Sequence, residues 1–215
     1  MFKVLFFTTA FMAAVCTTAV STSITPHAQF SSSIGVLGCM INVNRVAYFP
    51  SFPPCTSMCL KVRHGSRSVN LLHIDQSGGA HDISYDAWVY LQTGQSARQN
   101  PLQGGGIPAT YETVDMSQCQ GLIRSPDGKL PLMAANSMNF VTGCLADPQS
   151  YVARNYGLWN IATSTCRYGI NEKCTLNLAV SNQPKCPHQL GIQTPLTNMP
   201  VYNIEYWTGK EVLAL

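Results

Sequence analysis

Cysteines constrain this chain more than any other residue type. Cys16 lies in an apolar stretch that follows Lys3, and a small-residue region ending at Ala19 comes next. This order is typical of an export signal, so we expect residues 1–19 to be a signal peptide and the mature protein to be secreted. Eight cysteines then remain, and an even number in an exported chain predicts up to four disulfides. These cysteines are Cys39, Cys55, Cys59, Cys119, Cys144, Cys166, Cys174 and Cys186.

The sequence leaves the pairing of these cysteines open, because eight cysteines allow many connectivities. A zinc site is the alternative use for Cys55 with Cys59 and for Cys166 with Cys174. Their spacings, C-x3-C and C-x7-C, differ from the paired C-x2-C of common zinc sites, and an oxidising compartment favours disulfides. We therefore expect cross-links, no bound metal and no cofactor.

Charge and hydropathy exclude two classes of partner. Removing Lys3 from the 13 basic residues leaves 12 against 10 acidic ones, a net charge of +2, and no basic run offers a surface to nucleic acid. The apolar start is shorter than the roughly 20 residues that a bilayer core requires, and no later segment comes closer. We expect a monomer that is free of the membrane once the signal is removed. With 46% hydrophobic residues it can bury one good core.

Alternating and β-branched apolar residues predict a chain made mainly of strands, separated by Pro and Gly turns. Residues 20–34 are rich in Ser and Thr, and we expect them to form a flexible N-terminal segment. The predicted strands are Val46–Phe49, Leu60–Val62, Val69–Asp75 and Ile107–Val114, with a terminal hairpin from Pro200 to Leu215.

Helix signals are fewer. Ser84 is placed to cap a helix that carries Trp88 and Leu91 on one face and ends before Gly94. Leu130–Ala146 also has helical periodicity. Residues 166–186 are predicted to be a loop-rich, cross-linked region.

Four ionisable side chains lie within ten residues: His73, Asp75, His81 and Asp82. This clustering stands out in a chain with only 11% charged residues. Because strand side chains alternate between faces, we expect His73 and Asp75 to share a face. One interpretation is structural, with the carboxylates accepting amide hydrogen bonds at a turn and at the helix start. A metal site is another, although the interpretation that we favour is that His81 hydrogen-bonds locally and His73 is a partly buried strand residue.

The ordered signals between Cys39 and Cys119 resemble a double-psi β-barrel of the expansin and rare lipoprotein A type. The matching pieces are Asn44–Tyr48, the unit Cys55–Val62, the strand Val69–Asp75, H-D-I-S at His81–Ser84, and Gly106–Val114. The whole chain is also similar to a group of secreted fungal proteins of unassigned activity that share the phrase H-I-D-Q-S-G-G-A-H-D.

This resemblance implies a mainly β fold. We expect a six-stranded double-psi β-barrel with one short helix over residues 35–120. A mixed α and loop, disulfide-linked C-terminal extension over residues 121–215 is expected to pack on it.

The resemblance also carries expectations about chemistry. In family-45 endoglucanases, which share this barrel, the matching Asp is the general acid, so Asp82 is the candidate catalytic residue here. Inverting hydrolysis requires a second carboxylate as base, and the stretch Arg45–Pro50 that corresponds to the family's base motif contains no Asp or Glu. Asp75 is the remaining candidate for that role. Expansins also lack the base and are binders or wall looseners without appreciable hydrolysis.

Three functions remain open. The first, which we favour, is a non-hydrolytic protein that associates with cell-wall polysaccharide through a groove lined by Tyr48, Asp75, His81 and Asp82, with His73 as a further contact. The second is a hydrolase or lytic transglycosylase with Asp82 as its acid. The third is a protease inhibitor or effector with a secreted protein as its partner, because some secreted barrels of this class resemble inhibitors of papain-like proteases. An exposed, rigid loop bracketed by cysteines would favour it, and Pro50–Cys59 is the candidate segment.

Overall fold

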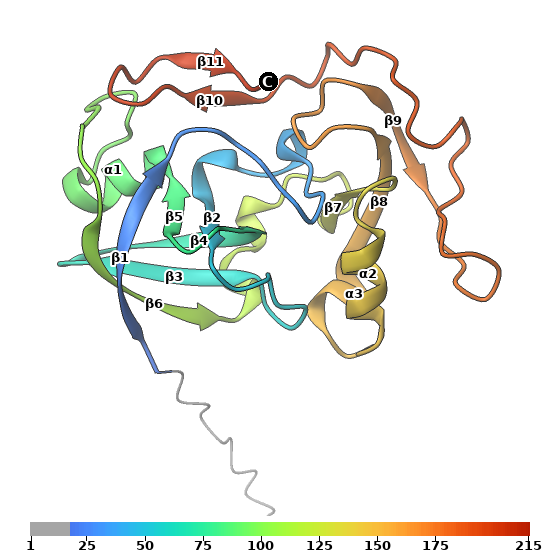
Figure 1. Ribbon diagram of the computed structural model, residues 1–215, viewed down its shortest axis with the longest axis horizontal. Helices are drawn as coiled ribbons and strands as arrows, with labels where there is room; N and C mark the ends of the chain where they lie inside the picture. The colour runs from blue at the N-terminus through green and yellow to red at the C-terminus, as the bar shows by residue number, and fades with distance from the viewer. Residues whose placement is uncertain (1–17) are drawn as a thin grey trace, which may run out of the picture.

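The computed structural model describes residues 18–215, so the predicted signal lies almost wholly outside the described residues. A closed six-stranded barrel, a three-stranded sheet and a two-stranded hairpin make up its β structure (Figure 1). The barrel strands are β1 (Val20–His27), β2 (Val46–Phe49), β3 (Cys59–His64), β4 (Arg67–Gln76), β5 (His81–Ser84) and β6 (Ile107–Val114). The other strands are β7 (Leu130–Met133), β8 (Tyr156–Ile161), β9 (Gly169–Cys174), β10 (Tyr202–Ile204) and β11 (Glu211–Leu213).

Three α-helices connect these strands. They are α1 (Tyr85–Thr93), α2 (Met138–Leu145) and α3 (Tyr151–Asn155). Four single-turn 3-10 helices complete the described secondary structure: η1 (Gly38–Met40), η2 (Val43–Arg45), η3 (Met116–Gln118) and η4 (Gln120–Leu122). Helix α1 follows β5 directly and leads back to β6.

The barrel closes in the order β1-β5-β2-β4-β3-β6. The pairs β1 with β5 and β2 with β4 are parallel, while the other four contacts are antiparallel. A parallel pair requires a long connection between its strands, so the chain crosses the barrel twice instead of following a simple meander. The prediction of a mainly β protein built on a closed six-stranded barrel is confirmed.

The segment 20–34 is not a loose entry to the fold. Its first part forms β1, which pairs with β5 on one side and β6 on the other and closes the barrel. Ile24 is fully buried in the barrel core, whereas Ser21 and Ser23 are exposed. The expectation of flexibility was wrong because β1 pairs along both edges, which satisfies the hydrogen-bonding groups of its backbone. Its polar residues lie on the exposed face of the sheet, where they are compatible with a strand.

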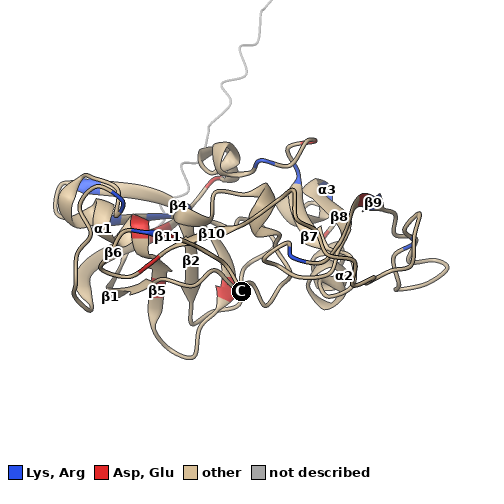
Figure 2. Ribbon diagram, turned by 90° about the horizontal axis from the view of Figure 1, so that it is seen from above, with Lys and Arg blue, Asp and Glu red and all other residues tan. Residues whose placement is uncertain are grey.

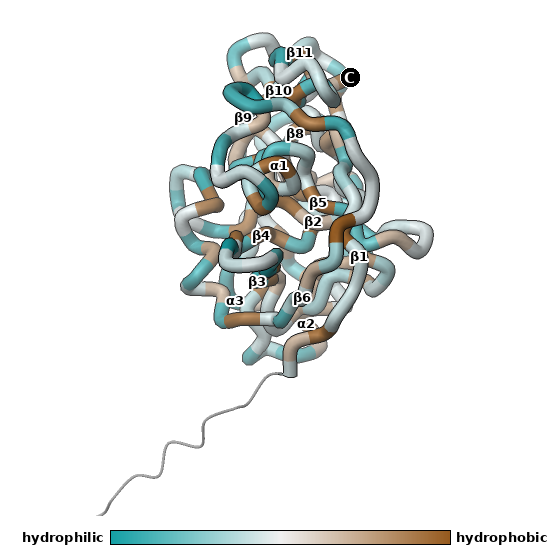
Figure 3. The backbone as a smooth tube through the Cα atoms, turned by 90° about the vertical axis from the view of Figure 1, so that its left-hand side faces the viewer, coloured by the Kyte–Doolittle hydropathy of each residue, from teal (hydrophilic) through white to brown (hydrophobic). Residues whose placement is uncertain are grey.

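The barrel sheet has a hydrophobic core on each of its two faces. One fills the barrel interior and includes Ala47, Phe49, Leu71 and Trp88. The other lies on the outer face and extends to the C-terminal part, where its members include Val46, Tyr48, Leu72 and Leu158. Figure 3 shows hydrophobic stretches of chain running through the middle of the barrel beside the labels of β2, β4 and β5.

Helix α1 lies where the sequence predicted it. Gly94 adopts a left-handed conformation with φ of 79° and donates to the Tyr90 carbonyl, which ends the helix. Trp88 is buried, and its indole N–H donates to the Gly105 carbonyl at 3.1 Å. Ser84 occupies the cap position, but its side chain makes no capping hydrogen bond.

The C-terminal extension contains β7, β8 and β9 with α2 and α3, on the right of Figure 1. Leu130–Met133 is a strand and not the start of a helix, so only the later part of the predicted helix 130–146 is helical. Four disulfides join the eight cysteines. They pair Cys39 with Cys166, Cys55 with Cys144, Cys59 with Cys119, and Cys174 with Cys186. The first two link the N-terminal half of the chain to the extension.

The predicted terminal hairpin is present as β10 and β11 and lies across the top of Figure 1, returning to the barrel beside α1. There the Tyr85 hydroxyl accepts from the Trp207 amide at 3.0 Å, and Arg98 pairs with Glu211. Within residues 18–215, no helix has the length and apolar character needed to cross a membrane.

Replacing Cys39 and Cys166 together by Ser is expected to lower the free energy of unfolding by roughly 3 to 5 kcal/mol, because this disulfide ties positions far apart in the chain. Its cysteines are 127 residues apart, against 12 for Cys174 and Cys186. Removing the second disulfide should therefore cost less. Guanidinium denaturation of both double variants measures the difference, and an equal or greater loss from the Cys174 and Cys186 pair contradicts the prediction.

Candidate functional site

The pairing of β2 with β4 contains a register shift that decides where the predicted site residues point. Ala47 pairs with His73, but the next residue, Tyr48, pairs with Asp75, so β4 has one extra residue, Ile74, at this point. Such a β-bulge reverses the alternation of side chains beyond it. His73 therefore lies on the face of Ala47, which is the barrel interior, and Asp75 lies on the outer face with Tyr48. The expectation that His73 and Asp75 share a face was wrong.

On the outer face, three predicted residues form a row across three strands. Tyr48 on β2 pairs with Asp75 on β4 and with Asp82 on β5. Tyr48 is 4% exposed and Asp75 is 8% exposed, whereas Asp82 is half-buried. The row thus runs from a buried carboxylate, past a buried phenol, to a carboxylate at the surface.

Tyr48 occupies the space between the two acidic residues. Burial raises the pKa of its hydroxyl well above the ordinary range, and the negative charges of Asp75 and Asp82 raise it further. The phenol is therefore neutral at all physiological pH values, and its hydroxyl donates to the Gln29 carbonyl at 3.4 Å. Neighbouring strands lie about 4.8 Å apart, so the backbones of Asp75 and Asp82 are separated by about 10 Å. A buried aromatic ring lies between them.

Hydroxyl groups hold both carboxylates. Ser31 donates to Asp75 at 3.0 Å, the amide of Gln76 donates to Asp75 at 2.8 Å, and Thr25 donates to Asp82. His27, which the sequence analysis did not place in the site, packs its ring 4.4 Å from the ring of Tyr48. The outer-face cluster therefore consists of Thr25, His27, Ser31, Tyr48, Asp75 and Asp82.

The two predicted histidines lie on the other face of the sheet. His81 pairs with Ile24, a residue of the barrel core, and its ring lies 4.8 Å from the ring of Phe49. The ring of His73 lies 5.6 Å from Phe49. Thr22 bonds Nδ1 of His81 at 3.0 Å. The sheet thus separates the two imidazoles from the carboxylate row, and the four ionisable side chains do not converge on one point.

His73 is a buried, neutral imidazole. It is 2% exposed, and its Nε2 atom has no hydrogen-bond partner among the described residues. Burial lowers the pKa of His73 to about 4, an effect that Asp75 opposes and His81 reinforces. Burial also lowers the pKa of His81, although Asp82 beside it acts in the opposite direction. Within residues 18–215, no cluster of three His, Cys, Asp or Glu side chains has a geometry suited to a metal ion.

Ser31 is also one of the residues that line an open cleft. The cleft has a volume of about 600 Å³ and lies between the segment that follows β1 and the loop between β8 and β9. Much of its lining carries hydroxyl groups, and we call it the hydroxyl-lined cleft. The hydroxyl residues are Ser31, Ser32, Ser33, Thr163, Ser164, Thr165 and Tyr168. Asp75 and Asp82 do not line it, but Ser31 joins it to Asp75 through a hydrogen bond.

Charged residues are interspersed along the molecule, as Figure 2 shows for both the barrel and the extension. Arg45 pairs with the buried carboxylate of Asp86 at 2.6 Å, and Lys173 pairs with Asp127 at 2.5 Å.

Sequence reasoning identified Tyr48, Asp75 and Asp82 as neighbours but missed Thr25, His27 and Ser31. These three lie in the segment that was expected to be flexible. The period-two alternation of β1, in which Thr25 and His27 share a face opposite Ile24, was the signal that could have placed these two residues. Ser31 lies beyond the end of β1, so this signal does not reach it.

Comparisons with known proteins place the chain in no family. No protein-family model matches it, and no curated protein matches it. Among solved structures it is similar to one described as the solution structure of the fungal elicitor cerato-platanin. That match has a TM-score of 0.31 and 18% sequence identity, and it covers 46% of this chain and 96% of the other. A likeness at this score carries no argument about fold or function, so the barrel rests on the strand pairing of the chain itself.

The burial of His73 predicts a pH dependence of stability. The folded pKa of about 4 lies below the ordinary value of 6.5, so between these values the unfolded chain binds a proton that the folded protein excludes. Stability is then fully present above pH 6.5 and falls as the pH decreases toward 4, by on the order of 3 kcal/mol. His73→Phe should flatten this dependence, whereas His64→Gln at a half-exposed strand end should not.

Urea denaturation at a series of pH values measures the effect, and an NMR titration of the His73 ring gives its pKa directly. A ring that titrates near 6.5 in the folded protein would show the prediction to be wrong.

Proposed function

We propose that this protein is exported and associates with cell-wall polysaccharide without cleaving it. The observation that carries the proposal is the hydroxyl-lined cleft, which opens beside the outer-face cluster and shares Ser31 with it. Its volume of about 600 Å³ lies in the range of small-ligand sites, and neutral hydroxyls are the donors and acceptors that match sugar hydroxyls. Four disulfides support export, since such cross-links persist in oxidising compartments.

The geometry around Tyr48 argues against bond cleavage. Inverting hydrolysis places a water molecule and a sugar between two carboxyl groups, and a retaining mechanism places the sugar there alone. In this protein the space between Asp75 and Asp82 is filled by Tyr48, and Asp75 is buried. Asp82 alone reaches the surface, where it serves as a hydrogen-bond acceptor for sugar hydroxyls. Polysaccharide contact is thus assigned to Asp82, Ser31 and the adjoining cleft.

Retention on insoluble chitin, cellulose and β-1,3-glucan, and on immobilised uronic-acid polysaccharides, tests this function. We expect the wild type to be retained on at least one of them with no release of reducing sugar. Asp82→Asn should weaken retention on the neutral polysaccharides several-fold, because the amide replaces a charged acceptor. Asp147→Asn removes the same charge from an exposed position in the extension and should leave retention unchanged.

No retention on any of these polysaccharides contradicts the proposal. Release of reducing sugar that Asp82→Asn abolishes would instead support the enzymatic alternative, with Asp82 as the acid.

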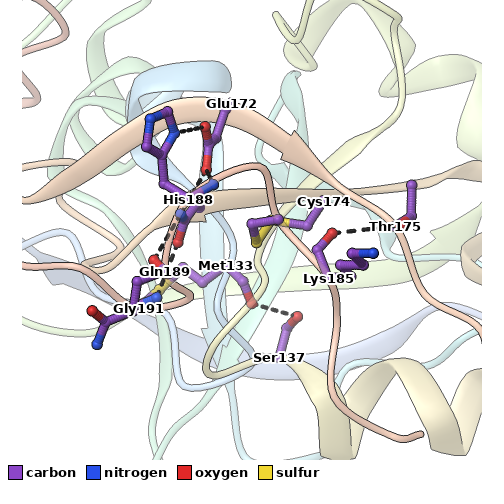
Figure 4. Close-up of a disulfide and its surroundings, with 11 residues drawn as sticks. Met133, Ser137, Glu172, Cys174, Thr175, Lys185, His188, Gln189 and Gly191 are labelled. Atoms are coloured by element: carbon purple, nitrogen blue, oxygen red, sulfur yellow. Dashed lines mark hydrogen bonds and ion pairs between the residues drawn. A yellow bond between two sulfur atoms is a disulfide. The ribbon is translucent and has the colours of Figure 1, made fainter.

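A second candidate function is inhibition of a secreted protease, and one loop favours it. Residues 175–185 form a loop closed by the Cys174–Cys186 disulfide and by two hydrogen bonds between the backbones of Thr175 and Lys185, each of 2.8 Å (Figure 4). At its tip Leu178 is 47% exposed and Val180 is 81% exposed. A closed loop that presents apolar side chains is preorganised for the cleft of an endopeptidase.

The structure favours this loop over the segment Pro50–Cys59 named from the sequence. In that segment Phe52 is exposed but packs edge-on against Phe140, and Cys55 is tied to α2 by the Cys55–Cys144 disulfide. No hydrogen bond closes its two ends on each other in the manner of Thr175 and Lys185.

The second candidate is tested by measuring the activity of a papain-like protease in the presence of increasing concentrations of this protein. If the loop inhibits, Val180→Asp should raise the inhibition constant at least about tenfold, because it places a charge in an apolar pocket. Val20→Asp, at an exposed position of β1, is the matched control. Inhibition that is absent, or equal in both variants, rules out this role for the loop.

A further inference from the structure

A second cleft adjoins the hydroxyl-lined cleft. It has a volume of about 410 Å³, and Pro195 and Tyr202 are among the residues that give it a more apolar lining. The two clefts share Thr165, Arg167 and Tyr168, which therefore form the wall between them. Together they make a path along the seam between the segment after β1, the loop between β8 and β9, and the terminal hairpin.

The loop that carries this wall is held rigidly. Cys166 is tied to Cys39 by a disulfide, the amide of Arg167 donates to the Thr163 hydroxyl at 2.8 Å, and the Arg167 carbonyl accepts from Leu196 at 2.8 Å. Cys166 has a φ of 56°, a left-handed conformation that is unfavourable for a residue other than glycine. Strained backbone that the surrounding structure maintains is a feature of ligand-binding sites.

The loop presents a cation, Arg167, that makes no ion pair among the described residues. Arg167 is the only residue with a charged side chain that lines either cleft, and the C-terminal residue Leu215 also lines the first cleft. Within residues 18–215, no ion pair and no side-chain hydrogen bond engages its guanidinium, which lies 5.8 Å from the centre of the Tyr168 ring. In another cleft, Arg45 and Arg98 are paired with Asp86 and Glu211, whereas its third arginine, Arg124, makes no ion pair among the described residues. Arg167 thus has its donors free at the junction of two clefts.

We propose that Arg167 selects polysaccharides whose sugar rings carry a carboxylate, binding one uronate group at the wall between the two clefts. This inference rests on the proposed function and names the substrate class of the same site. The guanidinium donates a bidentate pair of hydrogen bonds to the carboxylate, and Ser and Thr hydroxyls of the first cleft bind sugar hydroxyls. Tyr168 and Tyr202 offer apolar ring faces for the neighbouring sugars.

The composition of the two clefts favours a uronate over a phosphate. Arg167 supplies a single positive charge, which matches the single negative charge of a sugar carboxylate, whereas phosphate carries more charge and has further oxygens to satisfy. Neutral hydroxyls and aromatic rings surround the cation on both sides. That pattern fits a chain of hydroxylated rings with one acidic group in each.

The test compares polygalacturonate with its methyl ester, which keeps the sugar rings but removes the charge. Alginate provides a second polyuronide, and cellulose provides a neutral chain. We expect the wild type to bind polygalacturonate or alginate at least about tenfold more tightly than the ester, in a manner that weakens with salt. Arg167→Gln should abolish this preference, and Arg167→Lys should restore it only in part, because an ammonium cannot form the bidentate pair.

Arg154→Gln removes the same charge from an exposed position on α3 and should keep the full preference. Circular dichroism and the melting temperature confirm that the variants fold, since the backbone contacts of Arg167 remain in each. A wild type that binds the ester or cellulose as tightly as the acid overturns this inference and leaves the proposed function intact. A preference for the acid that persists in Arg167→Gln also overturns this inference and leaves the proposed function intact. A wild type that binds none of these polysaccharides overturns this inference, and it overturns the proposed function as well when chitin and β-1,3-glucan also fail to retain the protein.

Discussion

One extra residue in β4 determines how the barrel distributes its polar groups. Because side chains alternate between the two faces of a sheet, the additional Ile74 reverses every position after it. Without this bulge, Asp75 would face the same interior as His73, and two ionisable groups would be buried together. With it, the imidazole remains neutral inside the barrel, and the carboxylate reaches the outer face, where Ser31 and a backbone amide bind it.

The same register shift sets the chemistry of the outer face. Asp75 and Asp82 are brought to one level on either side of Tyr48. Burial of the Tyr48 phenol raises its pKa, and the two carboxylates reinforce that effect, so a neutral ring lies between the two acidic residues. Of the three, Asp82 alone is partly exposed.

The sequence predicted the barrel well where strands alternate clearly or follow turn signals, as in β3, β4 and β6. It failed at β1, whose single buried apolar residue, Ile24, gave too weak a pattern. It also failed at Leu130–Met133, because a short run that is buried on both faces has no period that separates strand from helix. The faces of His73 and Asp75 could not be predicted, since a bulge depends on the partner strand.

Site residues whose position depends on tertiary contacts could not be predicted from the sequence for a related reason. Nothing local distinguishes Arg167 from any other surface arginine; its position follows from the pairing of Cys39 with Cys166, and eight cysteines leave that pairing undetermined. The disulfide fixes a loop of the extension against the segment that follows β1, and the first cleft lies between these two parts. The second cleft lies between the same loop and the residues of the terminal region, 195–213. A barrel with strands on all sides offers few free backbone groups or open edges to a ligand. Recognition is then left to irregular segments that the barrel holds in place, which is why a rigid loop outside the barrel, and not the Asp row within it, is the better location for specificity.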